Sequence, residues 1–123
     1  MWRHEVLRGP VPADRDVVLE LVDHVQARTG RRPLSDARWV ELHGGSATGV
    51  LASDGDRPVA WAQFAPGHDG WTIEVVADPS TVALDGLIDR ALAEIGHHGG
   101  GRVRWWTFDD AAARWAADNG FHD

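Results

Sequence analysis

The stretch Trp71–Ile95, WTIEVVADPSTVALDGLIDRALAEI, decides the fold. Its first part is an apolar run that Asp78-Pro79 ends, which predicts a buried strand over Trp71–Ala77. Apolar residues then recur at the three- and four-residue spacing of an amphipathic helix, which we predict over Val82–Ile95. An aromatic-rich strand over Arg102–Phe108 follows. A strand, a helix and a strand in this order predict a crossover that joins two parallel strands of one sheet.

The sequence before this unit predicts antiparallel strands and two helices. Ser35 or Asp36 is a suitable N-cap for the second helix, and Asp54-Gly55-Asp56 is typical of a tight hairpin turn. A last, Ala-rich helix is expected from Asp109 or Asp110 to Asn119. The other expected elements are strands at Trp2–Arg8, Thr48–Ser53 and Pro58–Ala65 and helices at Asp14–Thr29 and from Ser35 or Asp36 to His43. This order predicts an α/β fold with a mixed, mostly antiparallel sheet flanked by helices.

Composition excludes several classes of protein. The chain has 123 residues, so we expect a single domain over residues 1–123. A formal net charge of −7 argues against duplex nucleic acid as a partner. No apolar run approaches the roughly 20 residues of a membrane helix, and no signal peptide is evident, so we expect a cytoplasmic protein without a membrane partner. Without Cys, Lys or Tyr, the chain has no thiolate ligand, no Schiff-base lysine and no tyrosine general acid.

Three stretches give the chain a family resemblance. Arg57–Ala62, RPVAWA, and Glu74–Pro79, EVVADP, resemble the third and the central strand of the GNAT superfamily of acetyl-CoA-dependent N-acetyltransferases. Ala112–Phe121, AARWAADNGF, is similar to the closing helix of that superfamily and the Gly-Phe that ends it. Within the superfamily, the chain looks most like the N-terminal half of mycothiol synthases. The resemblance implies a GNAT-like fold and acyl transfer from a CoA thioester to an amine.

The chain also departs from the GNAT pattern. The phosphate-binding loop of the family, Gln/Arg-x-x-Gly-x-Gly/Ala, is replaced by STVALDG over residues 80–86, which has one Gly, no Arg and an added Asp. Ala116 stands where the family has a Tyr that can protonate the departing thiolate. The family domain continues into a β-hairpin after Gly-Phe, so we expect the sheet to lack its final hairpin beyond Phe121.

Glu74 is the candidate catalytic residue. It lies in the middle of an otherwise apolar strand, where burial of an unpaired carboxylate costs several kcal/mol. A role as general base would explain a carboxylate there, because the base accepts the proton of the attacking amine. A structural pairing with Arg102 or Arg104 on the neighbouring strand explains it equally well.

The resemblance also implies a binding site for acetyl-CoA as co-substrate. Backbone groups of Val75, Val76 and Ala77 would bind the pantetheine arm, unless this stretch is only core strand. The pyrophosphate would lie at a helix N-terminus near Ser80, Thr81 and Gly86.

Tryptophans and histidines give weaker site candidates. Trp61 and Trp71 are candidates for the wall of a pocket for an apolar or cationic acceptor, although filling of the core is the better explanation for most of the tryptophans. We expect no metal site, because the adjacent His97 and His98 have no third ligand at a suitable spacing.

Two functions therefore stay open. The first is an acetyl-CoA-dependent N-acetyltransferase, or the acetyl-CoA-binding half of one, with a small-molecule amine as acceptor. The alternative is a catalytically inactive GNAT-like module whose open sheet edge is completed by a partner domain or by a second copy in a homodimer. A cleft between the central strand and its neighbour at Val75–Ala77 favours the enzyme, and a closed sheet there favours the module.

Overall fold

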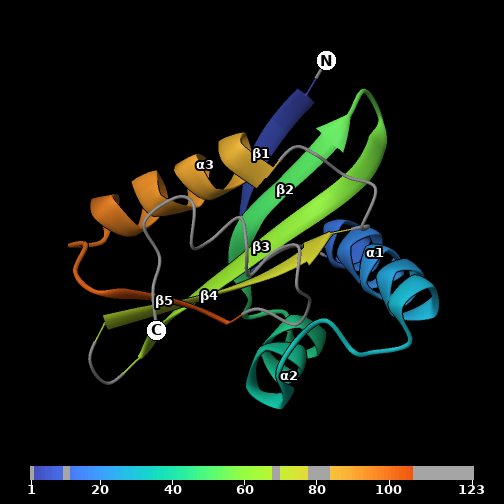
Figure 1. Cartoon of the computed structure of the whole chain (residues 1–123), viewed down its shortest axis with the longest axis horizontal. Coiled ribbons are helices and arrows are strands. Elements are labelled where there is room, and N and C mark those ends of the chain that lie inside the picture. The colour runs from blue at the N-terminus through green and yellow to red at the C-terminus, as the bar shows by residue number, and fades with distance from the viewer. Residues whose placement is uncertain (1, 10–11, 68–69, 78–83, 107–123) are drawn as a thin grey trace.

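The computed structural model describes residues 2–9, 12–67, 70–77 and 84–106 (Figure 1). The order of elements agrees with the prediction as far as the fifth strand, and the predicted last helix lies outside the described residues. The elements are β1 (Trp2–Arg8), α1 (Pro12–Thr29), α2 (Asp36–Gly44), β2 (Thr48–Asp54), β3 (Arg57–Gly67), β4 (Gly70–Ala77), α3 (Leu84–His97) and β5 (Val103–Trp106).

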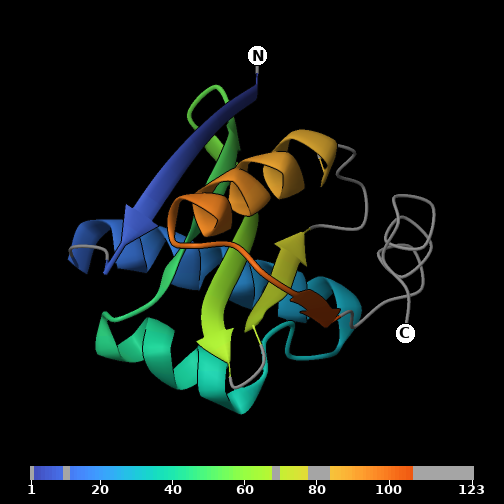
Figure 2. The same ribbon diagram turned by 90° about the vertical axis from the view of Figure 1, so that its left-hand side faces the viewer.

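One sheet holds all the described strands in the order β1-β2-β3-β4-β5. The pairings from β1 to β4 are antiparallel, and β5 pairs with β4 in parallel after the crossover through α3. The sheet is thus mixed and mostly antiparallel, as predicted. Helices α1 and α2 cover one face and α3 covers the other (Figures 1 and 2). Among the described helices, none is both long and apolar enough to span a bilayer.

A hydrophobic core lies on each face of the sheet. On one face, the apolar stripe of α1 packs against Trp61 of β3 and Val76 of β4. On the other, the stripe of α3 packs against Phe64 of β3 and Ile73 of β4. Successive side chains of β4 alternate between the two faces, so Ile73 and Val76 enter opposite cores. Glu74, two residues before Val76, shares the face that α1 and α2 cover.

Local sequence sets the bounds of the first two helices. Helix α1 begins at Pro12 rather than at Asp14, because proline is tolerated in the first turn, where its missing N–H needs no partner. Ser35 is the N-cap of α2, with an extended backbone at φ −66° and ψ 163° and a side chain that accepts a hydrogen bond from the Arg38 amide. Gly45 ends α2 in the left-handed region at φ 79°, where glycine has no Cβ penalty.

Candidate active site

The carboxylate of Glu74 is held by the N-cap residue of α2. The backbone N–H of Ser35 donates to Glu74 Oε1 and the Ser35 hydroxyl donates to Glu74 Oε2, both at 2.6 Å. Glu74 is only 3% exposed, so these bonds replace the water that the carboxylate loses on folding. Arg102 and Arg104, the partners considered from the sequence, are exposed residues. The partner that the structure shows on both carboxylate oxygens is Ser35, which the sequence alone did not connect with Glu74.

This contact completes a helix cap with a residue from another element. In a capping box, the third helical residue is a Glu or Gln whose side chain accepts from the N-cap amide. That position in α2 is Arg38, which has no acceptor on its side chain. Glu74 supplies the missing acceptor from β4, and its negative charge lies at the positive end of the α2 dipole.

A polar network continues from this cap beneath α2. Arg38 donates to the Thr72 hydroxyl at 3.1 Å and forms an ion pair with Glu41 at 3.0 Å. Gln63, which has no exposed surface, donates to the Arg38 carbonyl at 2.9 Å and to Glu41 at 3.3 Å. The Gln63 carbonyl accepts from the indole N–H of Trp61 at 3.1 Å. Helix α2 is thus attached to the middle of β3 and β4 by polar groups rather than by apolar packing alone.

Beyond Glu74, β4 extends past its pairing with β5. In the described residues, β5 pairs with Trp71–Glu74, and the last pair joins Glu74 to Trp106. Val75, Val76 and Ala77 pair with β3 on one side and have no partner on the other within the described part of the chain. Val75–Ala77, the stretch predicted to bind the pantetheine arm, is thus the part of β4 that has a strand partner on one side only among the described residues.

The residues predicted for the phosphate end are only partly described. Ser80 and Thr81 lie outside the described residues. Gly86 lies in the first turn of α3, where a Cβ would come within 2.8 Å of the His4 ring on β1. Close packing of α3 on His4 thus explains this glycine without a phosphate.

Trp61 and Trp71 do not line one common pocket. Trp61 is fully buried in the core beneath α1. Trp71 packs on the α3 side of the sheet, with its ring 6.1 Å from Phe64 and 6.0 Å from His98. Since the two side chains occupy opposite faces, the structure does not bring them together as an acceptor site.

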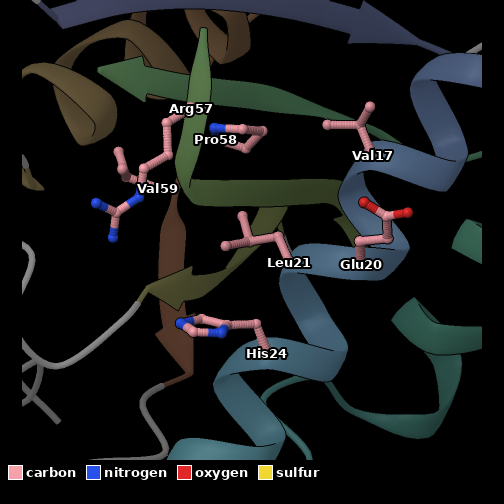
Figure 3. Close-up of a pocket in the computed structure, with 7 residues that line it drawn as sticks. All are labelled: Val17, Glu20, Leu21, His24, Arg57, Pro58 and Val59. Atoms are coloured by element: carbon pink, nitrogen blue, oxygen red, sulfur yellow. The ribbon is translucent and has the colours of Figure 1, made fainter. Parts of the chain in front are cut away.

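A pocket of about 230 Å³ lies between α1 and the start of β3 (Figure 3). It combines apolar residues with a carboxylate, an imidazole and a guanidinium. Val59 in its wall precedes Gln63, the cross-strand partner of Glu74, by about 13 Å along β3 at the usual strand rise. The pocket is therefore separate from the site around Glu74, and the sequence analysis did not find it. It is lined by Val17, Glu20, Leu21, His24, Arg57, Pro58 and Val59.

Comparisons with known proteins find similar sequences and similar folds. The chain is 35% identical over 114 residues to a mycothiol acetyltransferase from Thermobispora bispora, an alignment that covers 89% of this chain and 38% of that protein. A GCN5-related N-acetyltransferase from Ralstonia eutropha JMP134 has the same fold, with a TM-score of 0.70, 19% identity and coverage of 100% of this chain and 94% of that one.

A predicted acetyltransferase from Clostridium acetobutylicum, solved with acetyl-CoA, matches with a TM-score of 0.71 and 14% identity over 100% of this chain and 91% of that one. No family model matches the chain. The chain therefore has the fold of these GNAT acetyltransferases, and its sequence is similar to that of a mycothiol acetyltransferase. The chain spans 38% of the length of the mycothiol acetyltransferase that it matches.

Proposed function

We propose that this chain carries out, or binds acetyl-CoA for, the transfer of an acetyl group from acetyl-CoA to a small-molecule amine, with Glu74 as the general base. The observation that carries the proposal is the buried Glu74 carboxylate at the last β4–β5 pair of the described residues, beside Val75–Ala77, whose second edge has no partner among those residues. A thioester bound along that edge would place its carbonyl carbon near the only carboxylate of β4.

Backbone groups at the end of β4 would bind the co-substrate. The pantetheine arm would lie against Val75, Val76 and Ala77 as an added strand does, because these residues have no described partner on the β5 side. The N–H of Val75 or Val76 would polarise the thioester carbonyl. Ser80, Thr81 and Gly86 stay the proposed pyrophosphate end, on the likeness of the sequence to the family. The neighbour solved with acetyl-CoA supports this choice of co-substrate.

The proposed reaction is direct acyl transfer. The amine nitrogen attacks the thioester carbon, its proton passes to Glu74, and the carbon–sulfur bond breaks. Ala116 replaces the tyrosine that protonates the thiolate elsewhere in the family, so water supplies that proton here.

Calorimetry with acetyl-CoA and a thiol-release assay with a panel of primary amines test this function. We expect acetyl-CoA to bind and to raise Tm, since a ligand specific to the folded state stabilises it by mass action. Glu74→Gln, which keeps the shape of the side chain, should lower kcat by about 10²- to 10⁴-fold and leave acetyl-CoA affinity unchanged. Glu20→Gln, at an exposed carboxylate of α1, is the matched control and should leave kcat unchanged.

Two results would count against this function. The absence of both binding heat and a Tm shift at millimolar acetyl-CoA would exclude acetyl-CoA as the co-substrate. That result would favour the module that associates through its sheet edge. Binding of acetyl-CoA with equal thiol release by the wild-type chain and Glu74→Gln would exclude Glu74 as the base.

A further inference from the structure

Both oxygens of the proposed base are already occupied. Glu74 Oε1 accepts from the Ser35 amide and Oε2 accepts from the Ser35 hydroxyl, each at 2.6 Å. The Glu74 side chain is also almost completely buried, whereas Ser35 is partly exposed. Of the two residues, Ser35 is the one with surface that an amine can reach from solvent.

We infer that the Ser35 hydroxyl relays the proton of the attacking amine to Glu74; this inference rests on the function proposed above. As the nitrogen bonds to the thioester carbon, one N–H bond breaks and its proton moves to Ser35 Oγ. In the same step, the original Ser35 proton moves to Glu74 Oε2 across the 2.6 Å hydrogen bond. The serine ends unchanged, Glu74 ends protonated, and the positive charge of the nitrogen is discharged.

The geometry of the cap suits this transfer. A distance of 2.6 Å is within the range of charge-assisted O–H···O⁻ bonds, so the serine proton points at the acceptor before the reaction begins. The Ser35 amide fixes Oε1, which leaves Oε2 as the oxygen that receives the proton. The Arg38 amide at 3.4 Å faces Ser35 Oγ from the first turn of α2 and favours the negative charge that develops on this oxygen.

Three substitutions at Ser35 separate the relay from the helix cap. Ser35→Thr keeps both the hydroxyl and the capping oxygen. Ser35→Asn keeps a good N-cap but has no hydroxyl to pass a proton. Ser35→Ala removes the hydroxyl and keeps the backbone N–H that donates to Oε1, so it serves where the larger Asn perturbs folding. Ser46→Ala, an exposed hydroxyl after α2, is the matched control.

The assay follows thiol release from acetyl-CoA with whichever primary amine the unsubstituted chain accepts, and each variant is checked by thermal unfolding and by its acetyl-CoA affinity. We expect Ser35→Thr and Ser46→Ala to keep kcat within about 3-fold. Ser35→Asn and Ser35→Ala should lose about 10²-fold in kcat, the usual contribution of a positioned proton-transfer group, with the KM for acetyl-CoA unchanged. If Ser35 acted only as a helix cap, Ser35→Asn and Ser35→Thr would have the same kcat.

Each remaining outcome decides against the relay. Wild-type kcat in a folded Ser35→Asn and Ser35→Ala would show that Glu74 acts without Ser35, and the proposed function would stand. Equal losses in a folded Ser35→Thr and Ser35→Asn would show that the hydroxyl is not what matters. Absence of thiol release by the unsubstituted chain with every amine would overturn the acyl transfer and the relay together.

Discussion

Gln63 of β3 and Glu74 of β4 lie directly opposite each other in the sheet, and both bind α2. Gln63 donates to the Arg38 carbonyl within the helix, and Glu74 accepts from the Ser35 amide at its N-cap. One cross-strand pair thus fixes both the start and the body of a nine-residue helix. Because an isolated helix of this length is marginal in water, α2 depends on these contacts for its place over β4.

Removal of the Glu74 side chain should destabilise the fold. Glu74→Ala leaves the Ser35 amide and hydroxyl without their buried acceptor, and we expect a loss of about 2–3 kcal/mol in the free energy of unfolding. Urea unfolding followed by tryptophan fluorescence measures it. Glu20→Ala on the exposed side of α1 should change stability by no more than about 0.5 kcal/mol. Equal stability of the two variants would show that the Glu74–Ser35 bonds contribute nothing to folding.

The buried amide of Gln63 gives a second prediction. Gln63→Leu removes the acceptor of the Trp61 indole, which stays fully buried, and the donor to the Arg38 carbonyl and to Glu41. We expect a loss of about 1–3 kcal/mol, the cost of one unsatisfied buried polar group, because the Arg38 carbonyl lies within α2 and keeps its helical hydrogen bond. Gln26→Leu, on an exposed position of α1, is the control and should be close to neutral. A neutral or stabilising Gln63→Leu in thermal and urea unfolding would contradict this view of the network.

The packing of α3 on β1 can be tested at two glycines of one helix. Gly86→Ala adds a Cβ within 2.8 Å of the His4 ring and should cost about 1–3 kcal/mol. Gly96→Ala meets no atom within 4 Å and should be neutral or stabilising by up to about 1 kcal/mol, because alanine is the better helix former.

A double mutant isolates the cause of the Gly86 effect. If the His4 ring is the obstacle, His4→Ala should cancel most of the penalty of Gly86→Ala, a coupling that a double-mutant cycle measures. Additive effects of the two substitutions would place the cause elsewhere, and the glycine would then need another explanation, such as the proposed phosphate site.

The Glu94 carboxylate of α3 has a closer arginine partner in Arg8 than in Arg90. Glu94 is 6% exposed and accepts a hydrogen bond from Arg8 of β1, whereas Arg90 lies 3.9 Å away. Arg8→Met should cost about 1–2 kcal/mol, less than loss of a partner in a fully buried pair because Arg8 itself is 59% exposed. Arg90→Met should change stability by less than about 0.5 kcal/mol. Equal losses for the two variants in urea unfolding would refute this ranking.

Most of the fold could be predicted because its signals are local. The alternation of Trp71–Ala77 predicts which side chains enter which core, and the apolar stripe of α3 predicts the face that packs on the sheet. Glu74 could be found for the same reason, since a carboxylate inside an apolar run needs a partner wherever the strand lies. The observed elements begin or end a few residues away from the predicted bounds. These differences lie at a proline and at turns, where several neighbouring residues could each end an element.

The partners of these residues could not be predicted from the sequence. Ser35 is recognisable as a helix cap from its neighbours, but its contact with Glu74 joins positions 39 residues apart. Trp61 and Trp71 look alike in the sequence, and only their places on opposite faces of the sheet exclude a shared pocket.

The sequence by itself determined the described elements, their order and the single carboxylate of β4, because periodicity, caps and turn residues act over a few positions. Tertiary structure decided what that carboxylate touches. The crossing of the segment before α2 over β4 brings the Ser35 amide and hydroxyl to Glu74, and the sheet register places Gln63 beside it. Contacts of this kind depend on how helices pack on a sheet, and no local pattern encodes that packing.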